Sequence, residues 1–420
     1  TLVDHANVWL KKNLDVNVVT CETVTWMNTK KENLNDTEQM VCSKSIEENG
    51  ITHYKRGLRL WLLPQDPANA KQPGSIQVQD FTPESSNDTF PTLVKKANKK
   101  LTGVDGKVIC MEAVDVAVIN GNVDAKMTSW TEKTKDDASY AVTLRVFLRR
   151  ETVISETIGT KDFIPHPTEE GYEPFSDLIE KANTWLRDQN DIRVTNMQSV
   201  MVAKDDGPHS ETGSACFYKV PGLHTLESME FFRIMRLFFT RPAEDTISEI
   251  PVIYPFTFES FTPEVTITER KKRERMEKMK ETFGRIVDYL KTSEYEIICA
   301  ETVANPMQIV TERQGDETEQ VLTWLLTPRL YLTGQIPGSS NGGAKVSSRR
   351  QPSVRRDRNQ RESQKAEGET VEEEGNDHPG PIFLRNVVQG KRPYKMLVAF
   401  ISVFVAITII VVLSVVYSNQ

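Results

Sequence analysis

The chain has 420 residues, 38% of them hydrophobic and 26% charged, which is too long for one compact core and suggests about three domains by length. Its formal net charge of −7 excludes a general electrostatic attraction to nucleic acid. Five scattered cysteines exclude a dense disulfide scaffold, because such scaffolds carry many more cysteines for their length.

A fourfold internal repeat organises the first three quarters of the chain. Each copy has a leucine that ends a helical segment, an acidic or amide residue eleven or twelve positions later, and an Arg–aliphatic–aromatic–apolar tetrad. The leucines are Leu10, Leu101, Leu186 and Leu290. The acidic or amide residues are Glu22, Glu112, Gln198 and Glu301. The tetrads begin at Arg59, Arg145, Arg236 and Arg329.

Each copy is expected to begin with a helix and to continue in β-strands. In the third copy Leu178, Ile179, Ala182, Trp185 and Leu186 lie at helical spacing and form one apolar stripe. A β-rich run follows, then a polar hairpin, the tetrad strand, and a further strand that leads to a Phe-x-Pro corner. The predicted fold class is therefore α+β, with four tandem repeats that each pack one helix on an antiparallel sheet of three or four strands.

The predicted boundaries follow in chain order. Module 1 covers residues 1–65, and residues 66–151 carry a strand, the Phe-x-Pro corner and module 2. Module 3 covers residues 152–243, and residues 244–334 carry a charged helical arm and module 4. Residues 335–395, rich in Gly, Ser, Arg and Glu, predict a disordered linker. A transmembrane helix at 396–417 and a short tail at 418–420 complete the expectation.

The segment at 396–417 predicts a membrane anchor because it carries no charge and, as a helix, would rise about 33 Å, enough to cross the hydrocarbon core. Basic residues precede this segment between positions 385 and 395, and none follows it. This bias favours a tail-anchored protein with its modules in the cytosol. The open alternative is a type I protein, in which the sequons at Asn35 and Asn87 would accept glycans outside the cytosol.

The tetrads and the repeated acidic residues are the candidate binding residues. Strand alternation places the Arg and the aromatic residue of each tetrad on one face of a sheet. One interpretation is a cross-strand Glu–Arg pair, or stacking that seals one module against the next. The other is a recognition surface for an acidic partner. The candidates are Arg59, Trp61, Arg145, Phe147, Arg236, Phe238, Arg329, Tyr331, Glu22, Glu112 and Glu301.

A recurring asparagine in the helices also requires an explanation. Asn7, Asn98 and Asn183 each follow an alanine, and Val287 takes this place in the fourth helix. Asparagine is unfavourable inside a helix, so its recurrence predicts a hydrogen bond from its side chain to a strand or loop.

No motif in the sequence indicates catalysis. Gly-rich phosphate loops, GxSxG and HExxH are absent. His209, Cys216 and His224 lie close in the sequence but match no zinc spacing, so no metal and no cofactor are expected. Cys21 and Cys42 could form a bridge in an oxidising compartment, although free buried thiols are the favoured interpretation.

The sequence therefore predicts a non-enzymatic, membrane-tethered interaction protein that presents repeated modules to a protein partner, with avidity from multivalency. The alternative is a small-ligand binding protein or an enzyme with a pocket between the helix and the sheet of a module. A pocket lined by perturbed titratable groups would favour the alternative, and filled cores would exclude it.

Overall fold

The structure is a computed structural model that describes thirteen segments of the chain. These are residues 1–47, 49–65, 74–104, 106–150, 156–169, 171–189, 191–204, 214–220, 230–242, 255–268, 273–293, 295–314 and 317–333.

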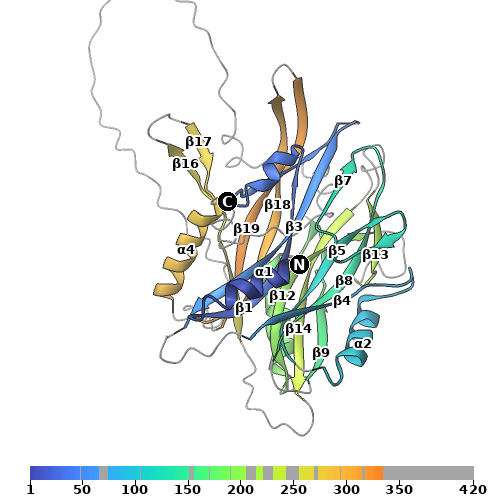
Figure 1. Ribbon diagram of the computed structural model, residues 1–420, viewed down its shortest axis with the longest axis vertical. Helices are drawn as coiled ribbons and strands as arrows, with labels where there is room; N and C mark the ends of the chain where they lie inside the picture. The colour runs from blue at the N-terminus through green and yellow to red at the C-terminus, as the bar shows by residue number, and fades with distance from the viewer. Residues whose placement is uncertain are drawn as a thin grey trace, which may run out of the picture. The chain divides into compact units, whose positions relative to one another are not determined.

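Long antiparallel strands dominate the described residues (Figure 1). The helices are α1 (Leu2–Leu10), α2 (Phe90–Leu101), α3 (Phe175–Arg187), α4 (Met279–Thr292) and the short 3-10 helix η1 (Lys31–Asn35). The long strands are β1 (Val16–Asn28), β3 (Ile51–Pro64), β5 (Lys107–Ile119), β8 (Ala138–Arg149), β12 (Arg193–Lys204), β14 (Glu230–Pro242), β18 (Ile297–Gln314) and β19 (Glu317–Thr333). The short strands are β2 (Val41–Ser45), β4 (Ile76–Phe81), β6 (Asn122–Val123), β7 (Ser129–Lys133), β9 (Glu156–Phe163), β10 (Pro167–Thr168), β11 (Gly171–Tyr172), β13 (Phe217–Val220), β15 (Phe256–Ser260), β16 (Val265–Thr268) and β17 (Arg273–Met276).

The predicted fold class of four α+β helix-on-sheet repeats and a membrane helix is wrong. The described chain is mainly β-sheet, and the sheets cross the predicted module boundaries. β2 pairs with β19, β7 pairs with β3, and β13 pairs with β8. Local sequence patterns do not predict this exchange, because β2, β7 and β13 pair with strands that lie far away in the chain.

The expected membrane helix is corrected as well. In the segments that the structure describes, no helix is both long enough and apolar enough to span a bilayer. The predicted span at 396–417, the linker at 335–395 and the tail at 418–420 lie outside these segments. The single-pass anchor therefore has no support, and neither the tail-anchored nor the type I location that depended on it is retained.

The charged arm before the fourth helix is also not helical where it is described. β16 pairs with β17, so that Val265 lies opposite Met276, and α4 begins only at Met279. Arg275 donates to Glu281 in the first turn of α4 at 2.7 Å. The sequence predicts ion pairs along one continuous helix. In the structure, the charges instead link the β16–β17 hairpin to the first turn of α4.

Four long strand pairs share one register and one irregularity. The pairs are β1–β3, β5–β8, β12–β14 and β18–β19. In each pair the acidic or amide residue of the sequence repeat lies opposite the arginine that opens the tetrad, as Glu22 lies opposite Arg59. Each first strand also shifts register about three residues before that position, for example between Val18 and Thr20. Such a bulge bends a strand and increases its twist.

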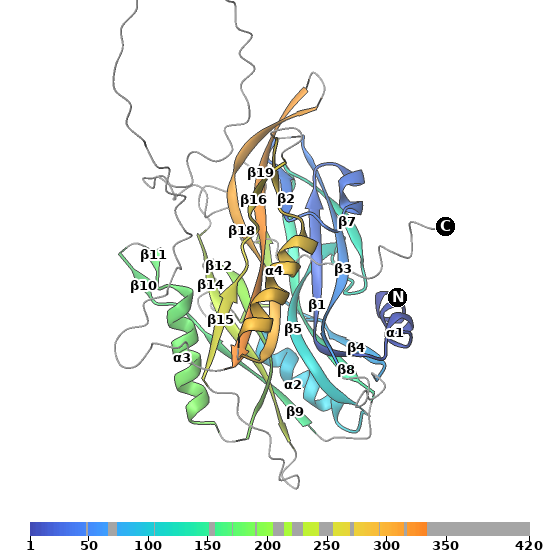
Figure 2. The same ribbon diagram turned by 90° about the vertical axis from the view of Figure 1, so that its left-hand side faces the viewer.

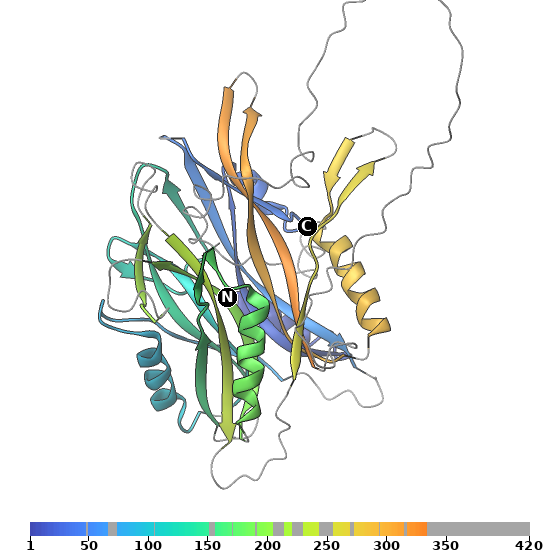
Figure 3. The same ribbon diagram turned by 180° about the vertical axis from the view of Figure 1, so that it is seen from behind.

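The helices cover these pairs in a cyclic order. Figures 2 and 3 show α1, α2, α3 and α4 on the outside of the long strands. Each helix shares a buried cluster with the tetrad aromatic residue of the next pair, and α4 with that of the first. Thus α1 shares a cluster with Phe147, α2 with Phe238, α3 with Tyr331 and α4 with Trp61. The buried core of each strand pair therefore includes side chains from the helix of another copy. In the last case, α4 of the fourth copy packs against Trp61 of the first copy.

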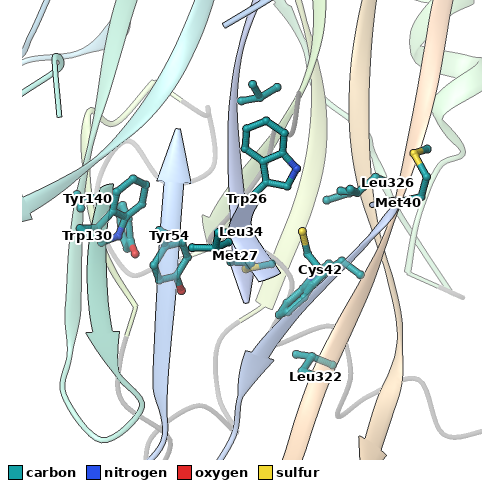
Figure 4. Close-up of a cluster of buried hydrophobic side chains, with 14 of the residues drawn as sticks. Trp26, Met27, Leu34, Met40, Cys42, Tyr54, Trp130, Tyr140, Leu322 and Leu326 are labelled. Carbon is teal, nitrogen blue, oxygen red and sulfur yellow. The ribbon is translucent and has the colours of Figure 1, made fainter. Parts of the chain in front are cut away.

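A further core cluster lies where the exchanged strands pair. Figure 4 shows Trp26 of β1, Tyr54 of β3, Trp130 of β7 and Tyr140 of β8 among its buried side chains. The Tyr54 and Trp130 rings stack with their centroids 4.8 Å apart. Because β7 and β3 come from different parts of the sequence, burial of these aromatic rings stabilises the strand exchange.

The prediction for the helix asparagines is confirmed. The Asn98 side chain donates to the carbonyl oxygen of Ile158 at 2.9 Å and accepts from its N–H at 2.8 Å. Asn7 holds Ile76 in this way, and Asn183 holds Phe256. Each asparagine thus fastens its helix to the first residues of a short strand, β4, β9 or β15.

We expect Asn98→Ala to lower the free energy of unfolding by about 2 kcal/mol, because it leaves both backbone groups of Ile158 without their partner. Val287→Ala, at the matching position of α4, is the control and should change stability by less than about 0.5 kcal/mol. Urea unfolding followed by circular dichroism measures both. Equal effects of the two substitutions would show that the asparagine bonds add nothing to stability.

Candidate functional site

The four repeated acidic or amide residues meet at the centre of the strand pairs and close a ring of hydrogen bonds. We call Glu22, Glu112, Gln198 and Glu301, with the residue that follows each of them, the polar ring. Each of the four side chains accepts one hydrogen bond from a backbone N–H of the neighbouring strand. The donor is always the residue directly after the repeated acidic or amide residue of that strand. The four bonds are Thr23 N to Glu112 at 2.8 Å, Ala113 N to Gln198 at 2.9 Å, Ser199 N to Glu301 at 2.7 Å and Thr302 N to Glu22 at 2.6 Å. The order of strands is β1, β5, β12, β18 and back to β1.

The residue at each donor position matches the acceptor that it faces. The three glutamates face a residue with a hydroxyl group, and this hydroxyl donates to the second carboxylate oxygen, as Ser199 donates to Glu301 at 2.6 Å. Gln198 faces Ala113, which has no hydroxyl, and its amide instead donates to the Ala113 carbonyl oxygen at 3.0 Å. Replacement of Glu by Gln in this copy therefore keeps every ring oxygen and nitrogen paired.

The tetrad arginines surround the ring and extend its network outwards. Arg329 Nη1 donates to Ser199 Oγ at 2.6 Å and to Glu301 at 3.1 Å. Arg145 Nη1 donates to Thr23 Oγ1 at 2.7 Å. Arg59 Nη1 donates to Thr302 Oγ1 and to Glu22, the latter at 3.4 Å. Each of these arginines therefore contacts a hydroxyl that itself belongs to the ring.

Two of the tetrad aromatic residues add donors to the ring. Trp61 Nε1 donates to Glu22 at 3.1 Å, and the Tyr331 hydroxyl donates to Glu301 at 2.8 Å. Phe147 and Phe238 have no donor and lie buried in apolar clusters. The aromatic positions thus supply hydrogen bonds only in the first and fourth strand pairs.

Burial sets the protonation of the ring acids. Burial raises the pKa of Glu112 to about 7, although Arg145 and the Thr23 bonds act in the opposite direction. Burial also raises the pKa of Glu22, against the charge of Arg59 and the hydrogen bond from Trp61. Glu112 thus carries part of a proton near neutral pH.

The space inside the ring is small. A cavity of about 10 Å³ is lined by residues of the ring, including Glu22, Glu112 and Glu301, and a neighbouring cavity of about 20 Å³ is lined by Thr23, Gln198 and Ser199 among others. Volumes of this size hold about one water molecule. Binding pockets for organic ligands are larger by more than an order of magnitude.

None of the eleven predicted site residues forms an exposed recognition surface. Eight of them belong to the ring or donate hydrogen bonds to it, Phe147 and Phe238 lie in apolar clusters, and Arg236 bonds Asp162. Ten of them are buried, and Arg145 is partly buried, with 11% of its side chain exposed. The contacts match the structural interpretation of the sequence, in which cross-strand pairing and stacking seal the strand pairs together. A binding role for these residues remains a prediction.

Sequence reasoning missed two sets of residues that complete the site. The first set follows the repeated acids and supplies the ring donors: Thr23, Ala113, Ser199 and Thr302. The second set precedes the phenylalanine of each Phe-x-Pro corner and binds the tetrad arginines: Asp80, Asp162 and Ser260. Both sets keep a fixed distance from residues already recognised in the repeat, which is the signal that could have identified them.

The cysteines, and the histidines that were considered as metal ligands and set aside, form no metal site and no disulfide in the described segments. All five cysteines are free and buried, and Cys21 N donates to Cys110 Sγ at 3.2 Å rather than bridging to Cys42. His209 and His224 lie outside the described segments, and no group of three possible metal ligands occurs within them.

We expect the Glu112 proton to make stability depend on pH. The folded pKa of about 7 lies above the value of about 4.3 for a free glutamate, so its contribution is complete below pH ~4.3 and is lost as pH rises through 7. The loss is about 4 kcal/mol at most. Glu112→Gln should flatten the decline between pH ~4 and pH ~7 in urea unfolding. Gln198→Glu is the reciprocal control and should steepen it, because Ala113 offers no hydroxyl. Parallel profiles for wild type and Glu112→Gln would show that Glu112 is ionised throughout.

No protein-family model, no curated protein sequence and no solved structure matches the chain. The function of the chain is therefore inferred from its own residues and contacts.

Proposed function

We propose that this chain is a non-enzymatic binding protein, in which the polar ring holds a β scaffold together and the outer surface contacts a protein partner. The observation that supports this proposal is the closed set of hydrogen bonds in the ring. Among the described residues, Glu22, Glu112, Gln198 and Glu301 each accept a backbone N–H of a neighbouring strand, and the two cavities beside them hold about one water molecule each.

A catalytic role needs a reactive group that a substrate can reach. Each ring carboxylate is buried and accepts a backbone N–H together with at least one side-chain donor. A substrate would have to displace these bonds and open the contact between neighbouring strands. The raised pKa of Glu112 is therefore better explained by burial inside a structural contact than by general acid or base chemistry.

The alternative of a small-ligand carrier is less well supported. One condition in its favour is met, because the cavity inside the ring is lined by Glu22 and Glu112, whose pKa values are both raised. The volume of about 10 Å³ opposes it, since even a small organic ligand needs several hundred Å³. We give the volume more weight, because burial raises a carboxyl pKa whether or not a ligand binds.

Native mass spectrometry of the full chain, purified from its source under mild conditions, tests the proposal. We expect a complex with a second polypeptide at fixed stoichiometry and no small-molecule adduct. Glu112→Gln should leave this complex unchanged at pH 7, because the variant alters the buried cavity and not the outer surface that contacts the partner. A stoichiometric adduct of small mass that disappears in Glu112→Gln would establish the ligand carrier instead.

A further inference from the structure

A second set of contacts lies beside the polar ring, two residues before each repeated acidic or amide residue. The residues at this position are Thr20, Cys110, Asn196 and Cys299. Cys110 Sγ accepts a hydrogen bond from Cys21 N at 3.2 Å. Cys299 Sγ accepts one from Met197 N, also at 3.2 Å. Each of these sulfur atoms thus contacts the residue that directly precedes the repeated residue of the neighbouring strand.

One of these contacts brings two cysteines together. The Cys299 sulfur faces a methionine, and Asn196 donates instead to the carbonyl oxygen of Met111 at 2.7 Å. Cys110 faces Cys21, and it also donates to the Cys21 carbonyl oxygen at 3.4 Å. Among the hydrogen bonds of this position in the described strands, only the one between β1 and β5 joins two cysteines, and Figure 2 shows these strands side by side.

The two thiols lie close enough to form a disulfide. Burial and a hydrogen bond to the Cys110 thiol raise the pKa of Cys21 well above its ordinary value. Both side chains are buried in one cluster, which also holds Leu58 and Phe147. A disulfide requires about 2 Å between its sulfur atoms, and rotation about the Cα–Cβ bonds brings two thiols in hydrogen-bond contact to this distance.

The remaining cysteines lie in other buried clusters. Cys42 belongs to the cluster drawn in Figure 4, and Cys216 and Cys299 belong to two further clusters. All five cysteines of the chain are described, and all are free thiols in the structure. Of the five, Cys21 and Cys110 are therefore the one pair that shares a cluster.

We propose that Cys21 and Cys110 form a disulfide when the chain folds in the presence of a small-molecule disulfide such as oxidised glutathione. The thiolate of one cysteine attacks this disulfide, forms a mixed disulfide and releases one small thiol. The second cysteine then attacks the protein sulfur of the mixed disulfide and releases the other small thiol. Two protein thiols are oxidised, the small disulfide is reduced, and both thiol protons end on the released thiols.

The bond would join two sheets that meet without a ladder. β1 and β5 belong to different sheets, and the ring bond from Thr23 N to Glu112 links them at 2.8 Å. The thiolate is the reactive form of a cysteine, so burial and the raised pKa of Cys21 make exchange slow once the chain has folded. The disulfide is therefore expected to form while the two strands come together and then to resist small thiols.

Refolding of the full chain from urea in reduced and oxidised glutathione tests the inference. When the circular dichroism signal has returned, free thiols are alkylated and tryptic peptides are mapped by mass spectrometry. We expect peptides 13–30 and 108–126 to be joined through Cys21 and Cys110, about tenfold more often than Cys21 is joined to Cys42. In urea the order should reverse, because Cys42 is 21 positions from Cys21 and Cys110 is 89, and the shorter loop closes with less loss of entropy.

Met197→Cys is the matched variant, because Met197 N contacts Cys299 Sγ at the distance at which Cys21 N contacts Cys110 Sγ. It should add a second disulfide, to Cys299. Cys110→Ala should abolish the first disulfide, whereas Cys299→Ala should leave it in place. The urea midpoint of the oxidised wild type should lie on the order of 1 M above that of the reduced wild type, because the disulfide restricts the unfolded chain.

Two results would overturn the inference. In the first, Cys21 and Cys110 are both alkylated in chain that has refolded with oxidised glutathione. In the second, the refolded chain joins Cys21 to Cys42 as often as to Cys110, which would show that the contact between β1 and β5 does not direct the pairing. Neither result affects the complex expected by mass spectrometry, because the thiols are buried away from the outer surface.

Discussion

The rest of the structure depends on one kind of hydrogen bond between the central strands. A backbone N–H on the edge of one strand donates to a side-chain oxygen of the neighbouring strand. Strands β1, β12 and β18 each end a sheet, so their inner edges carry N–H groups that no ladder pairs. Glu22, Glu112, Gln198 and Glu301 supply acceptors at the point where these edges meet. Side-chain bonds of this kind let the sheets meet without one continuous ladder and pair the four edge N–H groups that meet at the ring.

The same arrangement explains why the centre tolerates buried charge. An isolated buried carboxylate is costly, and pairing offsets this cost only when the remaining lone pairs are also satisfied. Each ring glutamate has a backbone donor, a hydroxyl donor and a neighbouring arginine, except where Gln198 and Ala113 replace the charge and the hydroxyl together. A change of one residue without the other would leave an oxygen or a carbonyl group unpaired. The ring therefore couples the residue at each acceptor position to the residue at the donor position that it faces. A glutamate opposite the arginine is not required in the third copy, because Gln198 faces Ala113 there.

Features that repeat at a fixed spacing could be predicted from the sequence. It located the helices, the acid opposite each arginine and the strand contact of the helix asparagines, because periodicity and register are local properties. It failed for the strand exchange, since nothing in Ser129–Lys133 specifies pairing with Ile51–Lys55 across more than seventy residues. It left open whether the arginine faces turn inwards and seal the modules together or form an exposed recognition surface. Alternation assigns residues to a face of a strand but does not say whether another sheet covers that face.

Internal repetition gives each position of this protein three comparisons within the same chain, and those comparisons separate packing from possible function. Where all four copies agree, as in the bulge before each ring residue, the common feature is explained by the fold alone. Where one copy departs and its neighbour compensates, as at Gln198 and Ala113, the departure is still structural. At β3, Nε and Nη2 of Arg59 have no hydrogen-bond partner, whereas Arg145, Arg236 and Arg329 each bond an Asp or Ser of β4, β9 or β15. This departure concerns the strand that covers the outer edge of each pair and leaves the ring bonds of the first copy intact, so the ring does not depend on the covering strand.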